Sequence, residues 1–205
     1  MIAIAALFTA TAIFTTSCGV SQYEKTIQNL KAAIEGETGA SAKYMAFSIR
    51  AAEEGFYNIS RMFAAASEAE AIHVRTHNSV LEGLGQRPHN PTPEEPVVST
   101  TLENLFAAID GETYEFEVMY PGFIADARAE TSEAAVRTFE WAMRAEMTHA
   151  RLYAVALEIL AETGSDATVP SVWYVCPTCG DLFYTIENVD RCPLCGVAPS
   201  DFLIF

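Results

Sequence analysis

The chain has 205 residues, half of them hydrophobic, which is enough for a buried core and argues against disorder over most of its length. Asp and Glu number 27 against 12 Lys and Arg. The resulting formal net charge of −15 argues against electrostatic binding of nucleic acid or an anionic membrane surface. Four of the 5 cysteines fall between Cys176 and Cys195, which indicates a metal site rather than a disulfide scaffold.

The N-terminal segment, residues 1–20, carries no charged side chain. Its apolar run, residues 2–14, is shorter than the roughly 20 residues that span a bilayer, but it fits the apolar region of a secretory signal. Ser17-Cys18-Gly19 is similar to a bacterial lipoprotein site, in which Cys18 would carry the lipid. Against this, no Lys or Arg precedes the run, and Thr15 stands where Leu is usual. The alternative is an extension packed on a cytoplasmic protein, so the sequence leaves the location open.

Two helices are expected between residues 21 and 84. Ser21 and Glu24 have the spacing of a capping box, and Gly55 marks the turn after the first helix. The second helix is expected from Phe56 to Leu84, with Gly85 ending it. Helical spacing of apolar side chains supports the first helix: Ile27, Leu30, Ile34, Tyr44, Phe47 and Ile49.

The second half of the chain repeats the first after a linker. Residues 85–100 hold four prolines and are expected to form a crossover rather than a helix. NLFAAIDGET at 104–113 then matches NLKAAIEGET at 29–38. Two helical hairpins with one long connection predict an all-α four-helix bundle of the ferritin-like kind over residues 21–165. Pro121 should kink the third helix or lie at a local distortion.

The repeat carries acids and histidines at the spacing of a metal site. Glu70 and His73, like Glu146 and His149, are three residues apart and share a helix face. Glu37 and Glu112 occupy equivalent places on the other two helices. The helical rise of about 1.5 Å per residue puts Glu37 and Glu70 at similar heights, roughly 22–27 Å from the turn. Such a set is typical of di-iron and di-manganese carboxylate bundles; the alternative is a set of solvated surface charges.

One acid breaks the symmetry of the repeat. Glu115 follows Glu112 by three residues on the same face, whereas the first repeat has Ala40 there. The site would therefore hold five Glu and two His, with a spare carboxylate that can exchange with another ligand. His77 has no counterpart in the second repeat and His89 lies in the linker. Both are predicted not to be ligands.

A second, small domain is expected at residues 170–205. Cys176-Pro-Thr-Cys179-Gly and Cys192-Pro-Leu-Cys195-Gly are two turns that can each place two thiolates on one ion. Four thiolates select zinc or iron, and spacing alone does not separate the two. The neighbouring di-metal bundle favours redox-active iron. Aromatic residues that could pack such a module surround the turns: Trp173, Tyr174, Phe183 and Phe202.

These motifs together resemble the rubrerythrin family. The similarity rests on GETGASAKY (36–44), EAIH (70–73), DGETYEFEVMYPGF (110–123), EMTH (146–149) and a rubredoxin-like C-terminal module. It implies that Glu115 and His73 alternate on one iron as the oxidation state changes, and that Tyr44 and Tyr120 hydrogen-bond near the irons. From the residues alone, core aromatics with a satisfied hydroxyl would be the preferred interpretation of these tyrosines. The implied di-iron ligands are Glu37, Glu70, His73, Glu112, Glu115, Glu146 and His149.

The resemblance implies a peroxidase that reduces hydrogen peroxide to water, with electrons relayed through one iron on Cys176, Cys179, Cys192 and Cys195. Glu115 is a candidate proton relay, with Tyr44 and Tyr120 as its catalytic neighbours. Electron transfer would occur between the subunits of a head-to-tail homodimer. The electron donor would be rubredoxin or a separate reductase that uses NADH or NADPH, because the chain has no Gly-x-Gly-x-x-Gly motif.

Two other functions remain open from the sequence. A ferroxidase that handles iron would use the same bundle, although it has no need of the four-cysteine module. A metal-dependent sensor or structural module would hold zinc in the tail and show no turnover.

Overall fold

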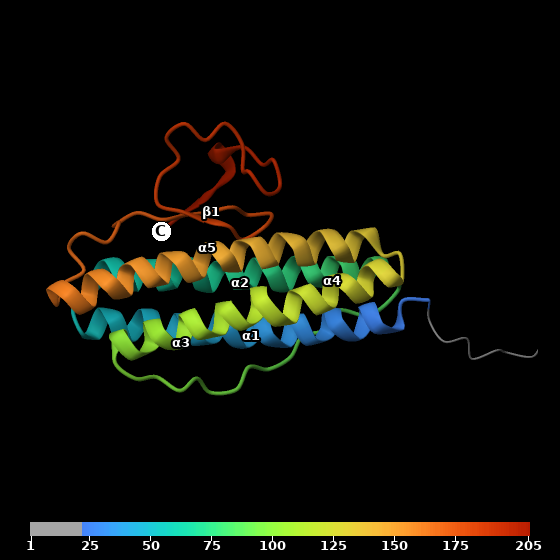
Figure 1. The fold of residues 1–205 in the computed structure, drawn as a ribbon, viewed down its shortest axis with the longest axis horizontal. Helices are drawn as coiled ribbons and strands as arrows, with labels where there is room; N and C mark the ends of the chain where they lie inside the picture. Colours follow the sequence, from blue (N-terminus) through green and yellow to red (C-terminus); the bar gives the residue numbers. More distant parts are fainter. Residues whose placement is uncertain (1–21) are drawn as a thin grey trace, which may run out of the picture.

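The computed structural model describes residues 22–205. The prediction about Cys18 and the proposed Ser21 cap lie outside these residues. Four long rods form a ferritin-like bundle, as predicted (Figure 1). They are α1 (Glu24–Glu53), α2 (Tyr57–Gly83), a third rod made of α3 (Thr101–Tyr114), η1 (Glu115–Met119) and α4 (Tyr120–Ala129), and α5 (Glu133–Thr163). In the described part of the chain, no helix has the length and apolar character needed to cross a membrane.

The first hairpin closes at a left-handed turn. Gly55 has φ +88°, a conformation that favours glycine, and α2 begins two residues later. Residues 86–100 contain neither helix nor strand and run along α1 and α3, as the four prolines predict (Figure 1).

The start of α1 is capped from a distant part of the chain. The helix begins after Tyr23, which provides no side-chain cap. The Glu130 carboxylate instead accepts hydrogen bonds from the backbone N–H groups of Lys25 and Thr26, at 2.9 and 2.8 Å. This contact spans more than 100 residues, so local sequence spacing could not indicate it.

The third rod contains the distortion expected at Pro121. Residues Glu115–Met119 form a π-helical turn, in which the N–H of Tyr120 donates to the carbonyl of Glu115. Pro121 lies directly after this turn, in the first turn of α4, where its missing N–H costs no hydrogen bond. The extra residue in the turn changes the helical phase between Glu112 and Tyr120, and both side chains are buried.

The bundle core has two apolar halves. One contains Phe47, Phe63 and Tyr153 and continues into the C-terminal module through Trp173. The other contains Ile34 and Phe139, with further buried residues from all four rods. Along α1, Glu37 falls between Ile34 of one half and Ala40 of the other, so the buried polar residues separate the halves.

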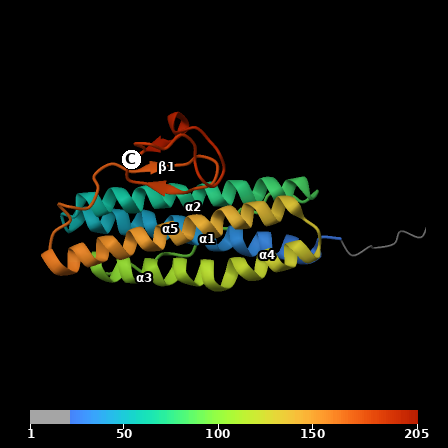
Figure 2. The ribbon, with the colours of Figure 1, turned by 45° about the horizontal axis from the view of Figure 1, so that its top comes forward.

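The C-terminal module is a small antiparallel sheet. Its strands β1 (Tyr174–Val175), β2 (Leu182–Phe183) and β3 (Leu203–Ile204) are arranged in the order β2-β1-β3. A short 3-10 turn, η2 (Pro199–Asp201), precedes β3. Both views show the module seated on the side of the bundle formed by α2 and α5 (Figures 1 and 2).

Candidate metal centres

Two overlapping groups of potential ligands lie inside the bundle. One consists of Glu37, Glu70, His73 and Glu146, and the other of Glu70, Glu112, Glu146 and His149; within each, the ligand atoms lie within 4.8 Å of one another. All six side chains are 1% exposed or less. Glu70 and Glu146 belong to both groups. Each Glu-x-x-His pair was expected to face its own ion, and the shared acids instead have the arrangement of carboxylates that bridge two ions.

The two histidines present one nitrogen to the carboxylates and the other to the C-terminal module. Nε2 of His73 donates to the carbonyl oxygen of Cys179 at 3.0 Å, and Nε2 of His149 donates to that of Gly180 at 3.1 Å. A carbonyl oxygen can only accept, so these bonds place the proton on Nε2 and leave the Nδ1 lone pair for a metal.

The other ring nitrogen of each histidine, Nδ1, lies where a cation would fit. Nδ1 of His73 lies 2.9 Å from Glu70 and 2.8 Å from Glu146, and Nδ1 of His149 lies 2.7 Å from Glu146. Neither nitrogen has a hydrogen-bond partner, and neither oxygen of Glu70 or Glu146 has one. Buried lone pairs that converge without donors are costly unless a positive ion lies between them.

The negative charges of the buried carboxylates also require positive ions to balance them. Burial, followed by the negative charge of Glu146, raises the pKa of Glu37 to about 8, and burial together with Glu70 raises that of Glu112. Burial opposes protonation of His73, but the charges of Glu146 and Glu37 raise its pKa well above the usual range. Two divalent cations would balance the four carboxylates of the two groups. The donor set and the orphaned atoms therefore define a carboxylate/histidine di-metal site.

Tyrosine hydroxyls hold two of the carboxylates. Tyr44 donates to Oε1 of Glu112 at 2.6 Å, and Tyr120 donates to Oε1 of Glu37. Both rings are buried in the bundle core. Tyr44 and Tyr120 are therefore core aromatics and, at the same time, hydrogen-bond partners of carboxylates in the site. The hydroxyl of a third buried tyrosine, Tyr153, has no partner within residues 22–205, and its ring lies 5.5 Å from that of Tyr44.

His77 lies outside both ligand groups but is connected to the site. Its Nε2 is 3.1 Å from the Tyr120 hydroxyl, and its Nδ1 is 2.9 Å from the hydroxyl of Thr138. Burial lowers the pKa of His77 to about 3, so the ring is neutral. The i,i+4 spacing from His73 was a signal that this histidine would lie on the inner face. His89 pairs with Glu35 at the surface, outside the site.

Glu115 belongs to neither four-residue group among the described residues. Its side chain lines a cavity between α1, α3 and the linker, and its Oε2 is buried without a hydrogen-bond partner. Nδ1 of His73 thus lies within 2.9 Å of both shared carboxylates, whereas Glu115 lies outside the two ligand groups.

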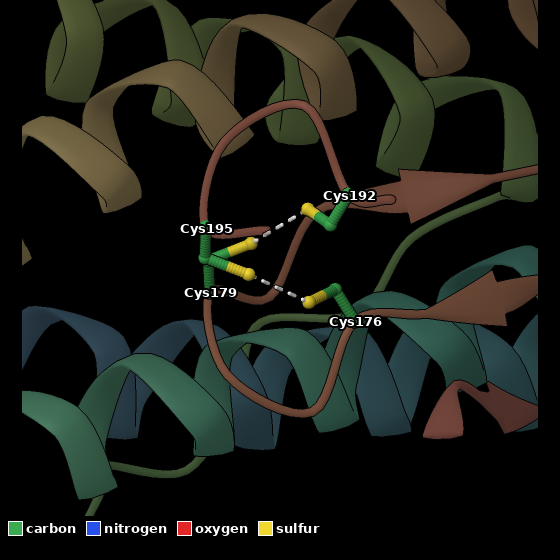
Figure 3. Close-up of side chains that lie close together, drawn as sticks. All are labelled: Cys176, Cys179, Cys192 and Cys195. Carbon is green, nitrogen blue, oxygen red and sulfur yellow. Dashed lines mark hydrogen bonds between the residues drawn. The ribbon is translucent and has the colours of Figure 1, made fainter. Parts of the chain in front are cut away.

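The four cysteines of the C-terminal module form a second centre. The sulfur atoms of the two turns face one another, with Cys176 Sγ 3.3 Å from Cys195 Sγ and Cys179 Sγ 3.5 Å from Cys192 Sγ (Figure 3). A disulfide needs about 2.05 Å, whereas thiolates around one ion lie at separations of this kind. The turns are near copies, because Gly180 N–H donates to Cys176 O at 3.0 Å and Gly196 N–H to Cys192 O at 2.9 Å. The arrangement is a four-cysteine metal site.

The sequence indicates that Gly180 lets its cysteine turn bend, but it does not reveal that this residue also contacts the di-metal site. Gly180 has φ +73°, and a Cβ at this position would overlap Nε2 of His73 and lie 2.8 Å from its Cδ2 and 3.0 Å from the Ala69 carbonyl. Gly196 has φ +82° but open space around it. The first turn therefore contacts the di-metal site closely, and the second does not.

A four-helix carboxylate bundle with two histidines and a four-cysteine module defines a ferritin-like di-metal protein of the rubredoxin-containing type. The sequence profile described as Rubrerythrin matches residues 28–157. The chain belongs to the rubrerythrin family.

Proteins of this family align with most of the chain. It is 38% identical to nigerythrin of Nitratidesulfovibrio vulgaris, over 83% of this chain and 81% of the relative. It is 36% identical to rubrerythrin-2 of Clostridium acetobutylicum, over 86% and 94%. A solved structure of nigerythrin in a fully reduced, all-ferrous state matches with TM-score 0.78 and 34% identity, over 94% of this chain and 91% of that chain. A bacterioferritin of Desulfovibrio desulfuricans shares the fold alone, with TM-score 0.65 and 19% identity, over 75% and 92%.

Proposed function

We propose that this chain is a peroxidase that reduces hydrogen peroxide to water, with iron in both centres and electrons supplied through the four-cysteine site. Rubrerythrin-family proteins are generally peroxide-reducing oxidoreductases. The nigerythrin relative is described with ferrous iron, and the donor sets found here suit that metal. The overall reaction takes up two electrons and two protons, breaks the O–O bond and releases two water molecules.

The observation that carries this proposal is the contact between the two centres. Two hydrogen bonds join the backbone of the cysteine turn to both histidines of the di-metal site. The path from Cys179 Sγ to His73 Nδ1 crosses covalent bonds and one hydrogen bond. A ferroxidase or a structural zinc module would have no use for such a contact. The path lies within one chain, so transfer between the subunits of a homodimer remains a prediction that a dimer structure would test.

Protein side chains around the site set the geometry of the reaction. Tyr44 and Tyr120 fix the orientation of Glu112 and Glu37 through their hydroxyl hydrogen bonds. Glu115 is free of the ligand groups, and its unpartnered Oε2 is available to bind the oxidant or to transfer a proton to the leaving oxygen. Bound iron would supply the electrons that cleave the O–O bond.

The test is anaerobic reduction of the iron-loaded protein, followed by one equivalent of hydrogen peroxide. The visible band of the cysteine-bound iron reports oxidation of that centre. We expect the band to return rapidly with peroxide and much more slowly with dioxygen. Faster return with dioxygen would contradict the proposal and favour a ferroxidase. A metal-replete protein with no visible band would show that the tail holds zinc, as a structural module requires.

The ligand roles are testable in the same protein. Glu37, Glu70, His73, Glu112, Glu146 and His149 are proposed to hold the two bundle irons, and Glu115 to join them when the oxidation state changes. Reduced and oxidised crystals should then differ at Glu115 and His73. The electron donor would be rubredoxin or an NAD(P)H-dependent reductase, and either can be assayed by its ability to restore the reduced visible spectrum.

A further inference from the structure

A cavity of about 810 Å³ lies between α1, α3 and the proline-rich linker. The linker stands on this side of the bundle, away from the C-terminal module (Figure 1). Gly36, Gly39 and Ala40 of α1 form one wall, and Ala107 of α3 lies in another. Glu115 also lines it.

The cavity approaches the metal site through Glu115, a carboxylate with no counterpart in the first repeat. Ala40 follows Glu37 by three residues and Glu115 follows Glu112 by three, so the two are equivalent positions of the repeat. Both line the cavity. The small side chain of Ala40 leaves space opposite Glu115, whose buried Oε2 lacks a hydrogen-bond partner. Oε2 itself is closed to the cavity, so a molecule there would contact Glu115 through the part of its side chain that lines the cavity.

The size of this space exceeds what hydrogen peroxide needs. A water molecule takes about 30 Å³ of liquid volume, so hydrogen peroxide needs roughly twice that. Cavities of about 300–1,000 Å³ are typical of sites for small organic molecules. Part of the lining is apolar or lacks a side chain, namely Phe47, Ala40 and Gly39 on α1 and the prolines of the linker, and the rest is polar or charged.

We propose that the cavity admits neutral organic hydroperoxides, ROOH, whose R group lies against the apolar walls while the hydroperoxide group reaches Glu115. This inference rests on the proposed peroxidase function. The O–O bond breaks, two electrons from the reduced di-metal site and two protons are taken up, and the products are the alcohol ROH and water. The four-cysteine site then restores the electrons, as for hydrogen peroxide.

Charge around the cavity selects neutral substrates. Glu35, Glu94, Glu95 and Glu103 line the cavity with a single lysine, Lys43. The ammonium group of Lys43 lies 5.1 Å from the centre of the Tyr44 ring, so part of its charge is engaged there. The whole chain also carries a net charge of −15. Anionic hydroperoxides, such as those of fatty acids, should be repelled.

The first experiment compares oxidants on the reduced, iron-loaded protein. Hydrogen peroxide, cumene hydroperoxide and linoleic acid hydroperoxide are each added at one equivalent, and the cysteine–iron band is followed. We expect the first two to restore the band rapidly and the anionic one to be at least about tenfold slower. Reaction with hydrogen peroxide but not with cumene hydroperoxide would overturn this inference and leave the proposed function standing. Reaction with neither would overturn both.

Variants locate the site. A Cβ at Gly39 would meet no heavy atom within 4 Å, so Gly39→Phe can place its ring in the cavity without strain at Cβ. Ala107→Phe fills it from the opposite wall. Gly83→Phe, at the exposed end of α2, is the control, because its Cβ also meets no neighbour. We expect each cavity variant to lose about tenfold or more in rate with cumene hydroperoxide. The rate with hydrogen peroxide should fall much less than the rate with cumene hydroperoxide, because the smaller oxidant needs less of the cavity, and the control should match the wild type with both oxidants.

A binding measurement separates the cavity from damage to the iron site. Cumyl alcohol, the product of cumene hydroperoxide, is added to zinc-substituted protein, and saturation-transfer NMR reports its binding. The wild type and Gly83→Phe should bind it, whereas Gly39→Phe and Ala107→Phe should not. Binding that both cavity variants retain, or a wild type that does not bind, would overturn the inference.

Discussion

The two metal centres are encoded in different ways. The four-cysteine site is built from two local turns, Cys176–Gly180 and Cys192–Gly196, and each turn closes its own hydrogen bonds. The di-metal site draws its ligands from four helical rods, and no two of those rods can form it alone. One centre therefore depends on short-range geometry and the metal, and the other on packing of the whole bundle. Variants at each centre should separate the two kinds of dependence.

The largest effect is expected from removal of a thiolate. Cys192→Ser leaves three cysteines for the ion in a module that has only three two-residue strands. Metal binding supplies about 10–16 kcal/mol in small zinc modules, and a comparable loss would unfold this one. Hydrogen exchange should show rapid exchange at β1, β2 and β3 while the bundle helices stay protected. Equal loss of protection in the bundle would mean that the two regions fold as a single unit.

Removal of a shared carboxylate should empty the other centre. Glu70 belongs to both ligand groups, so Glu70→Ala should abolish stoichiometric binding of two irons in the bundle while the cysteine–iron band remains. Glu68→Ala is the control, because Glu68 pairs with Arg75 at the surface of the same helix. Metal analysis of both proteins after anaerobic iron loading measures the difference. Full iron content in Glu70→Ala would refute the ligand assignment.

Substitution of the glycine that ends each cysteine turn tests the contact between the two metal centres. Gly180→Ala and Gly196→Ala introduce the same strain, because both residues have positive φ. Only the former places a methyl group against His73. We expect Gly180→Ala to slow return of the cysteine–iron band by at least about tenfold, equivalent to about 1.4 kcal/mol in barrier.

Two readouts decide this comparison, the visible spectrum of the oxidised protein and the rate of its oxidation by peroxide. Both variants should show the wild-type visible spectrum when oxidised, which confirms an intact cysteine site. Gly196→Ala should retain the wild-type rate of oxidation by peroxide. Equal rates in the two variants would mean that electrons do not pass through the docked turn.

Sequence reasoning succeeded where spacing alone determines geometry. The i,i+3 separation of Glu70 and His73 places both on one helix face, and the internal repeat gives the partner helices. The Cys-x-x-Cys-Gly spacing likewise determines each metal-binding turn. The contact of His73 with Cys179 joins residues 106 apart in the chain, so it depends on how the module docks. The hydrogen bonds of His77 with Tyr120 and Thr138 depend on packing in the same way.

The cap of α1 is the clearest case of a local pattern failing to identify a long-range partner, and it gives the smallest predicted effect. Burial alone would raise the pKa of Glu130, but the N–H groups of Thr26 and Lys25 outweigh burial and hold this pKa below its usual value. An acid with a lowered folded-state pKa stabilises the fold above its unfolded pKa. That stability is lost as the pH falls through the folded-state value.

We therefore expect Glu130→Gln to lower the free energy of unfolding by about 0.5–1 kcal/mol at neutral pH, the lower part of the range for loss of a helix cap. The deficit should begin to shrink below about pH 4.5, where Glu130 of the unfolded chain becomes protonated, and it should vanish as the pH falls through the lower folded-state pKa. Glu24→Gln removes the same charge from the same helix end without touching this contact, and it should cost less. Chemical denaturation of the metal-loaded proteins measures the free energy of unfolding of both variants. The pH should run from about 3.5 to 7, a range that includes the usual glutamate pKa. A pH-independent deficit would show that Glu130 acts through packing and not through its charge.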